Sequence, residues 1–152
     1  MSSSYESALA SAGAEQPVRE RIDQILKFLK ELDVDNVDDI FISEYLDQSG
    51  GEKRRVYESL MVFSAGYIHE AKNFLHSYNV DSLNLAHFTY WQVEKTDLDD
   101  VNKPQATSRI LVTLSTLHMM GCTLKASGEN CKTLLRLFKK HIASRAPNQV
   151  LS

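Results

Sequence analysis

An uncharged run near the C-terminal third of the chain constrains the fold most strongly. No Asp, Glu, Lys or Arg occurs between residues 110 and 124, and the next charge is Lys125. A helix on a protein surface needs a polar stripe that faces water, whereas this segment has only scattered Thr, Ser and His. It is also shorter than the roughly 20 apolar residues that span a bilayer. We therefore expect a helix over about 105–125 that is buried in protein.

Amphipathic segments on both sides predict the helices that would surround this central one. Six apolar residues fall on one helical stripe at the start of the chain: Val18, Ile22, Ile25, Leu26, Leu29 and Leu32. Further helices are expected over about 36–48, 52–78 and 83–95. A last helix is expected after a cap at Asn130, with Cys131, Leu134, Leu135, Phe138 and Ile142 inward. We find no clear strand alternation or hairpin signal.

The fold class predicted from these patterns is all-α. The expected architecture is a single globular bundle of six to seven helices around the central apolar helix. Residues 1–16, which are rich in small side chains, are interpreted as a flexible N-terminal arm. Residues 17–145 would form the helical bundle domain, and residues 146–152 a C-terminal tail.

Composition and charge limit the classes of partner. Hydrophobic residues make up 43% of the chain and charged ones 24%, as in folded globular domains. The net charge of −3 provides no general attraction to nucleic acid or to an anionic membrane. Residues 31–52 carry eight acids and no base, and residues 125–145 carry six bases and one acid. We interpret these two runs as solvated faces, with a partner surface as the alternative.

The remaining sequence signals place the protein inside the cell and give little support to catalysis. Cys122 and Cys131 lack the CxxC spacing and are predicted to be buried, reduced thiols. No signal peptide or membrane-spanning segment is evident. His69 and His76 lie seven residues apart, but nothing completes a metal set. The sequence therefore predicts a cytoplasmic protein that is not an enzyme and uses neither a metal nor a cofactor.

Arg109 is the most unusual single position in the predicted bundle. It would stand in the first turn of the buried helix, where the helix dipole disfavours a cation. One interpretation is a salt bridge to Asp99 or Asp100 within the chain. The other is that its guanidinium lies at the edge of an apolar surface and binds a carboxylate supplied by another molecule.

A central apolar helix that opens with Arg-Ile and is wrapped by amphipathic helices resembles the Bcl-type regulators of apoptosis (the B-cell-lymphoma-two family). In "DDVNKPQATSRILVTL" (99–114), Arg109 and the apolar residues after it match the first homology motif of that family. Thr107 and Ser108 stand where the family has Trp and Gly. The resemblance implies a helical fold with an apolar groove.

The other motifs of the family match only in part. Val56, Leu60, Phe63 and Tyr67 have the apolar spacing of the third homology motif, but Ala65 replaces its acid. The second homology motif and the C-terminal anchor are absent from the sequence. Motif loss of this extent is typical of viral members, so the resemblance implies a viral protein acting in the host cytoplasm, with any mitochondrial association arising through its partners.

The function implied by the resemblance is inhibition of apoptosis. The amphipathic death-motif helix of a pro-apoptotic protein would bind in the groove, with its aspartate paired to Arg109. The residues implied to line the groove, besides Arg109, are Phe74, Leu75, Leu85, Phe88, Trp91, Ile110 and Val112. A homodimer stays open as a further mode of association.

Two other functions remain open at this level. The long segment over 52–78, flanked by shorter ones, also has some of the pattern of a histone-fold-like subunit that heterodimerises in a transcription complex. A generic helical adaptor with an unrelated partner is the second alternative. Binding of death-motif peptides would separate these alternatives from an inhibitor of apoptosis.

Overall fold

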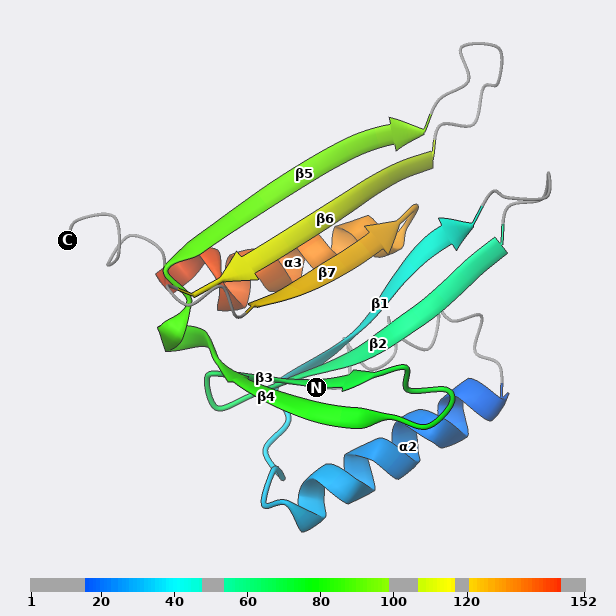
Figure 1. Ribbon diagram of the computed structural model, residues 1–152, viewed down its shortest axis with the longest axis vertical. Coiled ribbons are helices and arrows are strands. Elements are labelled where there is room, and N and C mark those ends of the chain that lie inside the picture. Colours follow the sequence, from blue (N-terminus) through cyan, green and yellow to red (C-terminus); the bar gives the residue numbers. More distant parts are fainter. Residues whose placement is uncertain (1–15, 48–53, 99–106, 117–120, 146–152) are drawn as a thin grey trace. The chain divides into compact units, whose positions relative to one another are not determined.

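The computed structural model describes residues 16–47, 54–98, 107–116 and 121–145 (Figure 1). These residues form two helices, seven strands and two short 3-10 turns. In chain order the elements are α2 (Gln16–Glu31), β1 (Asp39–Asp47), β2 (Arg54–Ser64), β3 (Tyr67–Lys72), β4 (Asn79–Asn84), η1 (Leu85–His87), β5 (Tyr90–Leu98), β6 (Thr107–Ser115), β7 (Gly121–Ser127), α3 (Asn130–His141) and η2 (Ala143–Arg145).

The all-α prediction is wrong, because the fold is mixed and mostly β. One antiparallel sheet has the strand order β1-β2-β3-β4, and a second has the order β5-β6-β7. The helical bundle around a central helix over 105–125 is therefore absent from the described residues. Because a Bcl-type fold consists of helices, the resemblance to that family is wrong as well, and so is the inhibition of apoptosis through a helical groove. The viral origin and mitochondrial association that the resemblance implied lose their basis.

The chain divides into two compact units. Unit 1 comprises residues 1–43 and 57–84, and unit 2 comprises residues 44–56 and 85–152. The N-terminal arm and the C-terminal tail that we expected lie outside the described residues, except for Gln16. The domain boundaries at 17 and 145 remain a prediction.

Helix α2 and the sheet residues beside it form the core of unit 1. The helix expected from the first apolar stripe is confirmed, because Val18, Ile22, Ile25 and Leu29 are all buried. They pack against strand and loop residues of the same unit, namely Ile40, Ile42, Leu60, Val62, Ala71 and Phe74. Leu32 was predicted on the same stripe but follows the helix and is 52% exposed.

The helix expected over 52–78 is instead a hairpin of β2 and β3. Ser64 pairs with Tyr67, so only Ala65 and Gly66 form the turn. Both have positive φ, 51° at Ala65 and 79° at Gly66, as type I′ hairpin turns require. The strand before the turn is buried on both faces at residues 60–63, which explains why its sequence shows no alternation of apolar and polar residues.

The central apolar segment forms β6 and β7 of unit 2 rather than a helix. Arg109 of β6 pairs with Ser127 of β7, and the register continues to Ser115 and Gly121. Alternate residues of β6 are buried, namely Ile110, Val112 and Leu114. They lie opposite the buried Ala126, Leu124 and Cys122 of β7. The uncharged run over 110–124 therefore lies mostly in two neighbouring strands, each of which has a buried face.

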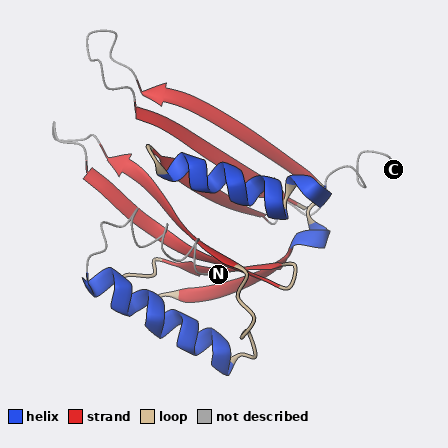
Figure 2. Cartoon of the chain, turned by 180° about the vertical axis from the view of Figure 1, so that it is seen from behind, coloured by secondary structure: helices blue, strands red, loops and turns tan. Residues whose placement is uncertain are grey.

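Helix α3 covers the apolar face of this three-stranded sheet (Figure 2). The helix expected after residue 130 is confirmed, and Leu134, Leu137 and Phe138 are buried. Leu135 was predicted inward but is 36% exposed. The helices expected over 36–48 and 83–95 are wrong, because the first range contains β1 and the second contains the end of β4, the turn η1 and most of β5. Within the described part of the chain, no helix is long and apolar enough to cross a membrane.

Candidate protein-interaction site

Strand β5 forms an outer edge of the three-stranded sheet. Among the described strands it pairs with β6 alone, along nine residues from Tyr90 opposite Ser115 to Leu98 opposite Thr107. Figure 1 shows β6 between β5 and β7. In an antiparallel pair, the residues whose N–H and C=O groups face the neighbour alternate with residues whose groups face away. Among the described residues, the outward-facing groups of β5 therefore have no strand beside them.

Three apolar side chains near the start of β5 are exposed. Tyr90 is 56% exposed, Trp91 is 38% exposed and Val93 is 36% exposed. Because side chains alternate along a strand, Trp91, Val93 and Lys95 project from the same face of the sheet. They stand opposite Leu114, Val112 and Ile110, which places them on the face that α3 covers.

Two contacts fix how α3 runs across that face. The Trp91 and Phe138 rings meet edge to face, with centroids 4.9 Å apart. Seven residues earlier in the helix, the Cys131 thiol donates to the Ser108 carbonyl at 3.5 Å. The C-terminal half of α3 therefore lies beside the start of β5. Its N-terminal end lies near the end of β5, because Ser108 is paired with Asp97 there.

Leu135 extends the apolar surface from β5 onto the helix. It precedes Phe138 by three residues, so the two side chains are neighbours on one side of α3. We call Trp91, Val93, Leu135 and Phe138 the β5–α3 strip. Three of these four side chains are at least 36% exposed, whereas Phe138 is buried, with 8% exposed. Trp91 and Val93 of the strip belong to β5 itself, so the strip lies next to the outer backbone edge of that strand.

The edge strand β4 of the other sheet is shorter than β5 and exposes no large apolar side chain. It has six residues, "NVDSLN", and none of its side chains is among the exposed large hydrophobics. Its Asp81 forms an ion pair with Lys72 at 3.0 Å, and both side chains are about half exposed. Short, polar edge strands are a common protection against unwanted pairing. Strand β5 is longer, with nine residues, and it carries three exposed apolar side chains.

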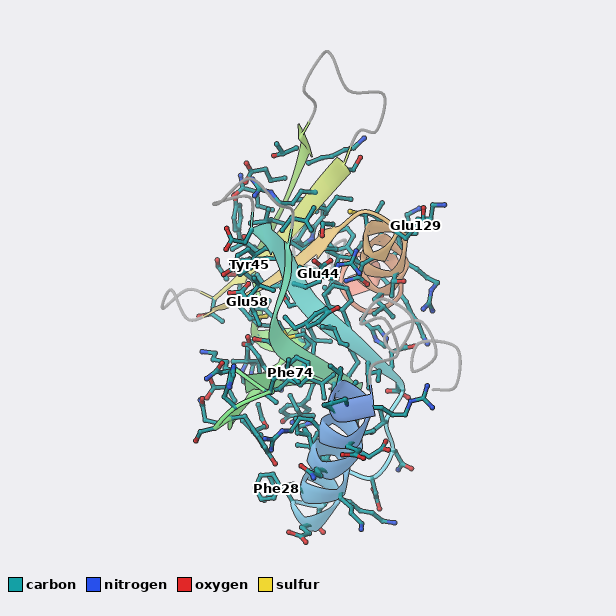
Figure 3. The ribbon with its side chains drawn as sticks, turned by 90° about the vertical axis from the view of Figure 1, so that its right-hand side faces the viewer. Phe28, Glu44, Tyr45, Glu58, Phe74 and Glu129 are labelled. Atoms are coloured by element: carbon teal, nitrogen blue, oxygen red, sulfur yellow. The ribbon has the colours of Figure 1, made fainter. Side chains whose placement is uncertain are left out.

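A buried carboxylate holds the corner from which α3 starts. Glu44, on β1, is fully buried (Figure 3). It accepts hydrogen bonds from the Ser127 backbone N–H at 2.8 Å, from the Ser127 hydroxyl at 2.7 Å and from the Asn130 side-chain amide at 3.3 Å. The Arg55 guanidinium Nε lies 3.6 Å from the same carboxylate. Glu44 thus ties the end of β7 and the first turn of α3 to one charged group.

The turn between β7 and α3 follows from the same residues. Gly128 has φ of 59°, a conformation that favours glycine. The N-cap position is Glu129, which makes no side-chain capping bond. Asn130, which we expected to cap the helix, is already its first residue and instead donates to Glu44.

Burial changes the acidity of the neighbouring thiol. Desolvation and the nearby Glu44 charge raise the pKa of Cys131. Both cysteines are buried and free, as predicted. In the described part of the chain, no three His, Cys, Asp or Glu residues form a group that could hold a metal ion.

The residues that were expected to line one groove are divided between the two units. Phe74 and Leu75 follow β3 in unit 1, where Phe74 is fully buried in the core (Figure 3). The other six lie in unit 2. Leu85 and Phe88 are buried before β5, while Ile110 and Val112 belong to the buried face of β6. A groove between three helices is therefore wrong as an explanation for these residues, because strands replace all three of those helices.

Arg109 and Trp91 occupy positions that the helical interpretation did not foresee. Arg109 lies within β6 between Thr96 and Ser127, on the face opposite α3. Its Nε is buried and has no hydrogen-bond partner among the described residues. Trp91 is exposed, and of the eight expected residues it alone belongs to the β5–α3 strip. Contact between these eight residues and a partner remains a prediction.

Sequence reasoning missed Val93, Leu135 and Glu44. The alternation of Trp91 and Val93 with Gln92 and Glu94 is a strand signal that was available in the sequence. Glu44 gave no signal, because its donors come from residues more than 80 positions away.

Comparisons with known proteins add no assignment to this geometry. No protein-family model, no curated protein and no solved structure matches the chain.

Proposed function

We propose that this protein is an interaction module that captures an extended segment of a partner protein by strand addition to β5. The observation that carries the proposal is the long outer strand β5, whose unpaired edge lies beside an exposed apolar strip. In strand addition, the main-chain hydrogen bonds of the edge provide affinity, and contacts with alternate side chains provide specificity. We propose a binding role rather than catalysis.

The geometry supports a partner segment with apolar residues at alternate positions. A strand paired with β5 would direct every second side chain toward the face that α3 covers. There it would meet Trp91, Val93 and Leu135. Aromatic residues such as Trp91 are typical centres of binding energy in protein interfaces.

A separate partner protein fits the edge better than a second copy of this chain. Glu94 and Lys95 lie in the middle of β5 and are both exposed. Charges at the centre of an edge strand are a common protection against self-pairing. A homodimer through β5 is therefore the competing outcome, and it would appear as concentration-dependent association. The net charge of −3 supports a protein partner rather than nucleic acid.

We also propose that the module acts in a reducing compartment, the cytoplasm above all. The support is the pair of buried free thiols, Cys122 and Cys131, because disulfides are rare where glutathione keeps thiols reduced.

The experiment is a titration with a capped peptide of alternating apolar and polar residues, acetyl-Asp-Thr-Val-Ser-Ile-Thr-Asp-amide, followed by NMR of the backbone amides. At about 3.3 Å per residue the peptide spans roughly 23 Å, within the length of β5. We expect saturable shifts in β5 and α3. Shifts confined to other elements, or no shifts at all, would overturn the proposal.

Trp91→Ala measures the contribution of the strip. Trp91 is 38% exposed, and a Trp surface of up to about 250 Å² leaves about 95 Å² to be covered. At about 25 cal/mol per Å² this corresponds to about 2.4 kcal/mol, or an upper limit of about 50-fold in Kd. Phe28→Ala is the matched control, because Phe28 is 39% exposed and also meets another ring edge to face.

A change in the peptide tests strand pairing without altering the protein. N-methylation removes one backbone donor, and the donors that face β5 lie at alternate residues. We therefore expect N-methylation at one set of alternate positions to abolish binding and at the other set to leave it nearly unchanged. Equal effects at both sets would exclude strand addition.

A further inference from the structure

Three lysines border the β5–α3 strip on the face that α3 covers. Lys95 follows Trp91 and Val93 at the next alternate position of β5, and it is exposed. Lys139 follows Phe138 in α3 and lies four residues after Leu135, on the same side of the helix. Lys132 precedes Leu135 by three residues; its side chain is 82% exposed and forms a solvent-exposed ion pair with Glu129 at 3.3 Å.

The direction of α3 places these lysines at the two ends of the strip. Because Phe138 contacts Trp91, Lys139 lies at the end of the strip nearest the start of β5. Because Cys131 contacts Ser108 beside the end of β5, the adjacent Lys132 lies at the other end, where Lys95 also stands. The sequence of α3, "NCKTLLRLFKKH", contains no acid.

The opposite face of β5 has a different charge. Glu94 lies between Val93 and Lys95 and projects from the face away from α3, together with Gln92 and Thr96. An acid on a paired strand directly beside Glu94 would meet a like charge, which is unfavourable in cross-strand pairs. The two faces of β5 thus favour different side chains in a bound strand.

We infer that the segment captured by β5 carries acidic side chains at both ends of the row that faces α3, with apolar side chains between them. The motif is acid, apolar, apolar, acid at alternate positions, with neutral residues in the intervening positions. This inference rests on the proposed function, since it describes the ligand of the same edge. The acids would pair with Lys139 at one end and with Lys95 and Lys132 at the other.

Two peptides of identical composition separate the charge pattern from strand addition itself. In acetyl-Asp-Thr-Val-Ser-Ile-Thr-Asp-amide the acids share a row with Val and Ile. In acetyl-Thr-Asp-Val-Ser-Ile-Asp-Thr-amide they lie in the other row. Exposed ion pairs each contribute modestly, so we expect the first peptide to bind about fivefold more tightly at low salt. The difference should fall toward unity at about 1 M salt, where the screening length is about 3 Å.

Charge reversal in the protein provides the matching test. The double variant Lys95→Glu and Lys139→Glu should remove or invert the preference between the two peptides, while Lys30→Glu on α2 should leave it unchanged. Equal Kd values for the two peptides, with shifts still in β5, would overturn the inference and leave the proposed function standing. A lack of shifts in β5 with either peptide would overturn both.

Discussion

Replacement of Glu44 by Ala tests whether one buried carboxylate fixes the corner between β7 and α3. The side chain is fully buried and accepts three hydrogen bonds, two from Ser127 and one from Asn130. Removal would leave the Ser127 N–H without this acceptor and would take the Glu44 carboxylate away from the Arg55 guanidinium. Breaking a buried charged network by removal of one partner typically costs about 3–5 kcal/mol.

The magnitude can be converted into a melting temperature. For a chain of 150–250 residues, 1 kcal/mol corresponds to about 2–4 °C, so Glu44→Ala should lower the Tm by about 6–20 °C. Glu44→Gln keeps one carbonyl acceptor and should cost about half as much. Glu129→Ala is the control, because the Glu129 side chain is 89% exposed and forms an ion pair with the exposed Lys132. This variant should change stability by less than about 0.5 kcal/mol.

Hydrogen exchange shows which amides lose protection in Glu44→Ala. We expect the Ser127 amide and the first turn of α3 to lose protection in Glu44→Ala, since Glu44 is their shared acceptor. Urea unfolding gives the free energy of the same variant. If Glu44→Ala unfolds at the wild-type urea concentration with the Ser127 amide still protected, the corner does not depend on this carboxylate.

Three further predictions concern the fold. Ala65→Asn should stabilise by about 0.5–1 kcal/mol in urea unfolding, because Asn tolerates the positive φ of this turn better than Ala; no gain would contradict the turn geometry. Leu134→Ala should cost about 2–5 kcal/mol and Leu135→Ala under about 1, since only Leu134 is fully buried. Burial raises the pKa of Glu70, so stability should fall as pH rises through its titration range, a slope that Glu70→Gln should remove.

The two helices were predictable because each has one exposed polar face and one buried apolar face. In α2 the buried residues Val18, Ile22, Ile25 and Leu29 recur at helical spacing between exposed charged residues. In α3 the buried Leu134 and Phe138 do the same between Lys132, Arg136 and Lys140. Such a stripe depends only on local sequence, so no knowledge of the neighbouring elements was needed.

The strands were missed because several are buried on more than one face. Residues 60–63 are all fully buried, so β2 reads as a continuous apolar run that fits a helix as well as a strand. In β6, Leu111 interrupts the alternation of Ile110 and Val112. The β-branched residues Ile110, Val112 and Thr113 favoured a strand there, but the missing charges outweighed them in the helical interpretation.

The candidate site depends on pairings that local patterns do not encode. Trp91 is predicted from the sequence as a binding residue, but its neighbours along a helix would have been residues three and four positions away. In a strand its neighbour on the same face is Val93, and its partner from α3 is Phe138, 47 residues further along the chain. An exposed edge also depends on the order of strands in the sheet, which only the tertiary structure provides.

Amide hydrogen exchange along β5, with and without the alternating Asp-Thr-Val-Ser-Ile-Thr-Asp peptide, tests the central claim most directly. If a partner strand pairs with this edge, bound peptide should slow exchange at every second amide of β5 and leave the amides that already face β6 unchanged. Exchange along β5 that is the same with and without saturating peptide would contradict capture of an extended segment at this strand.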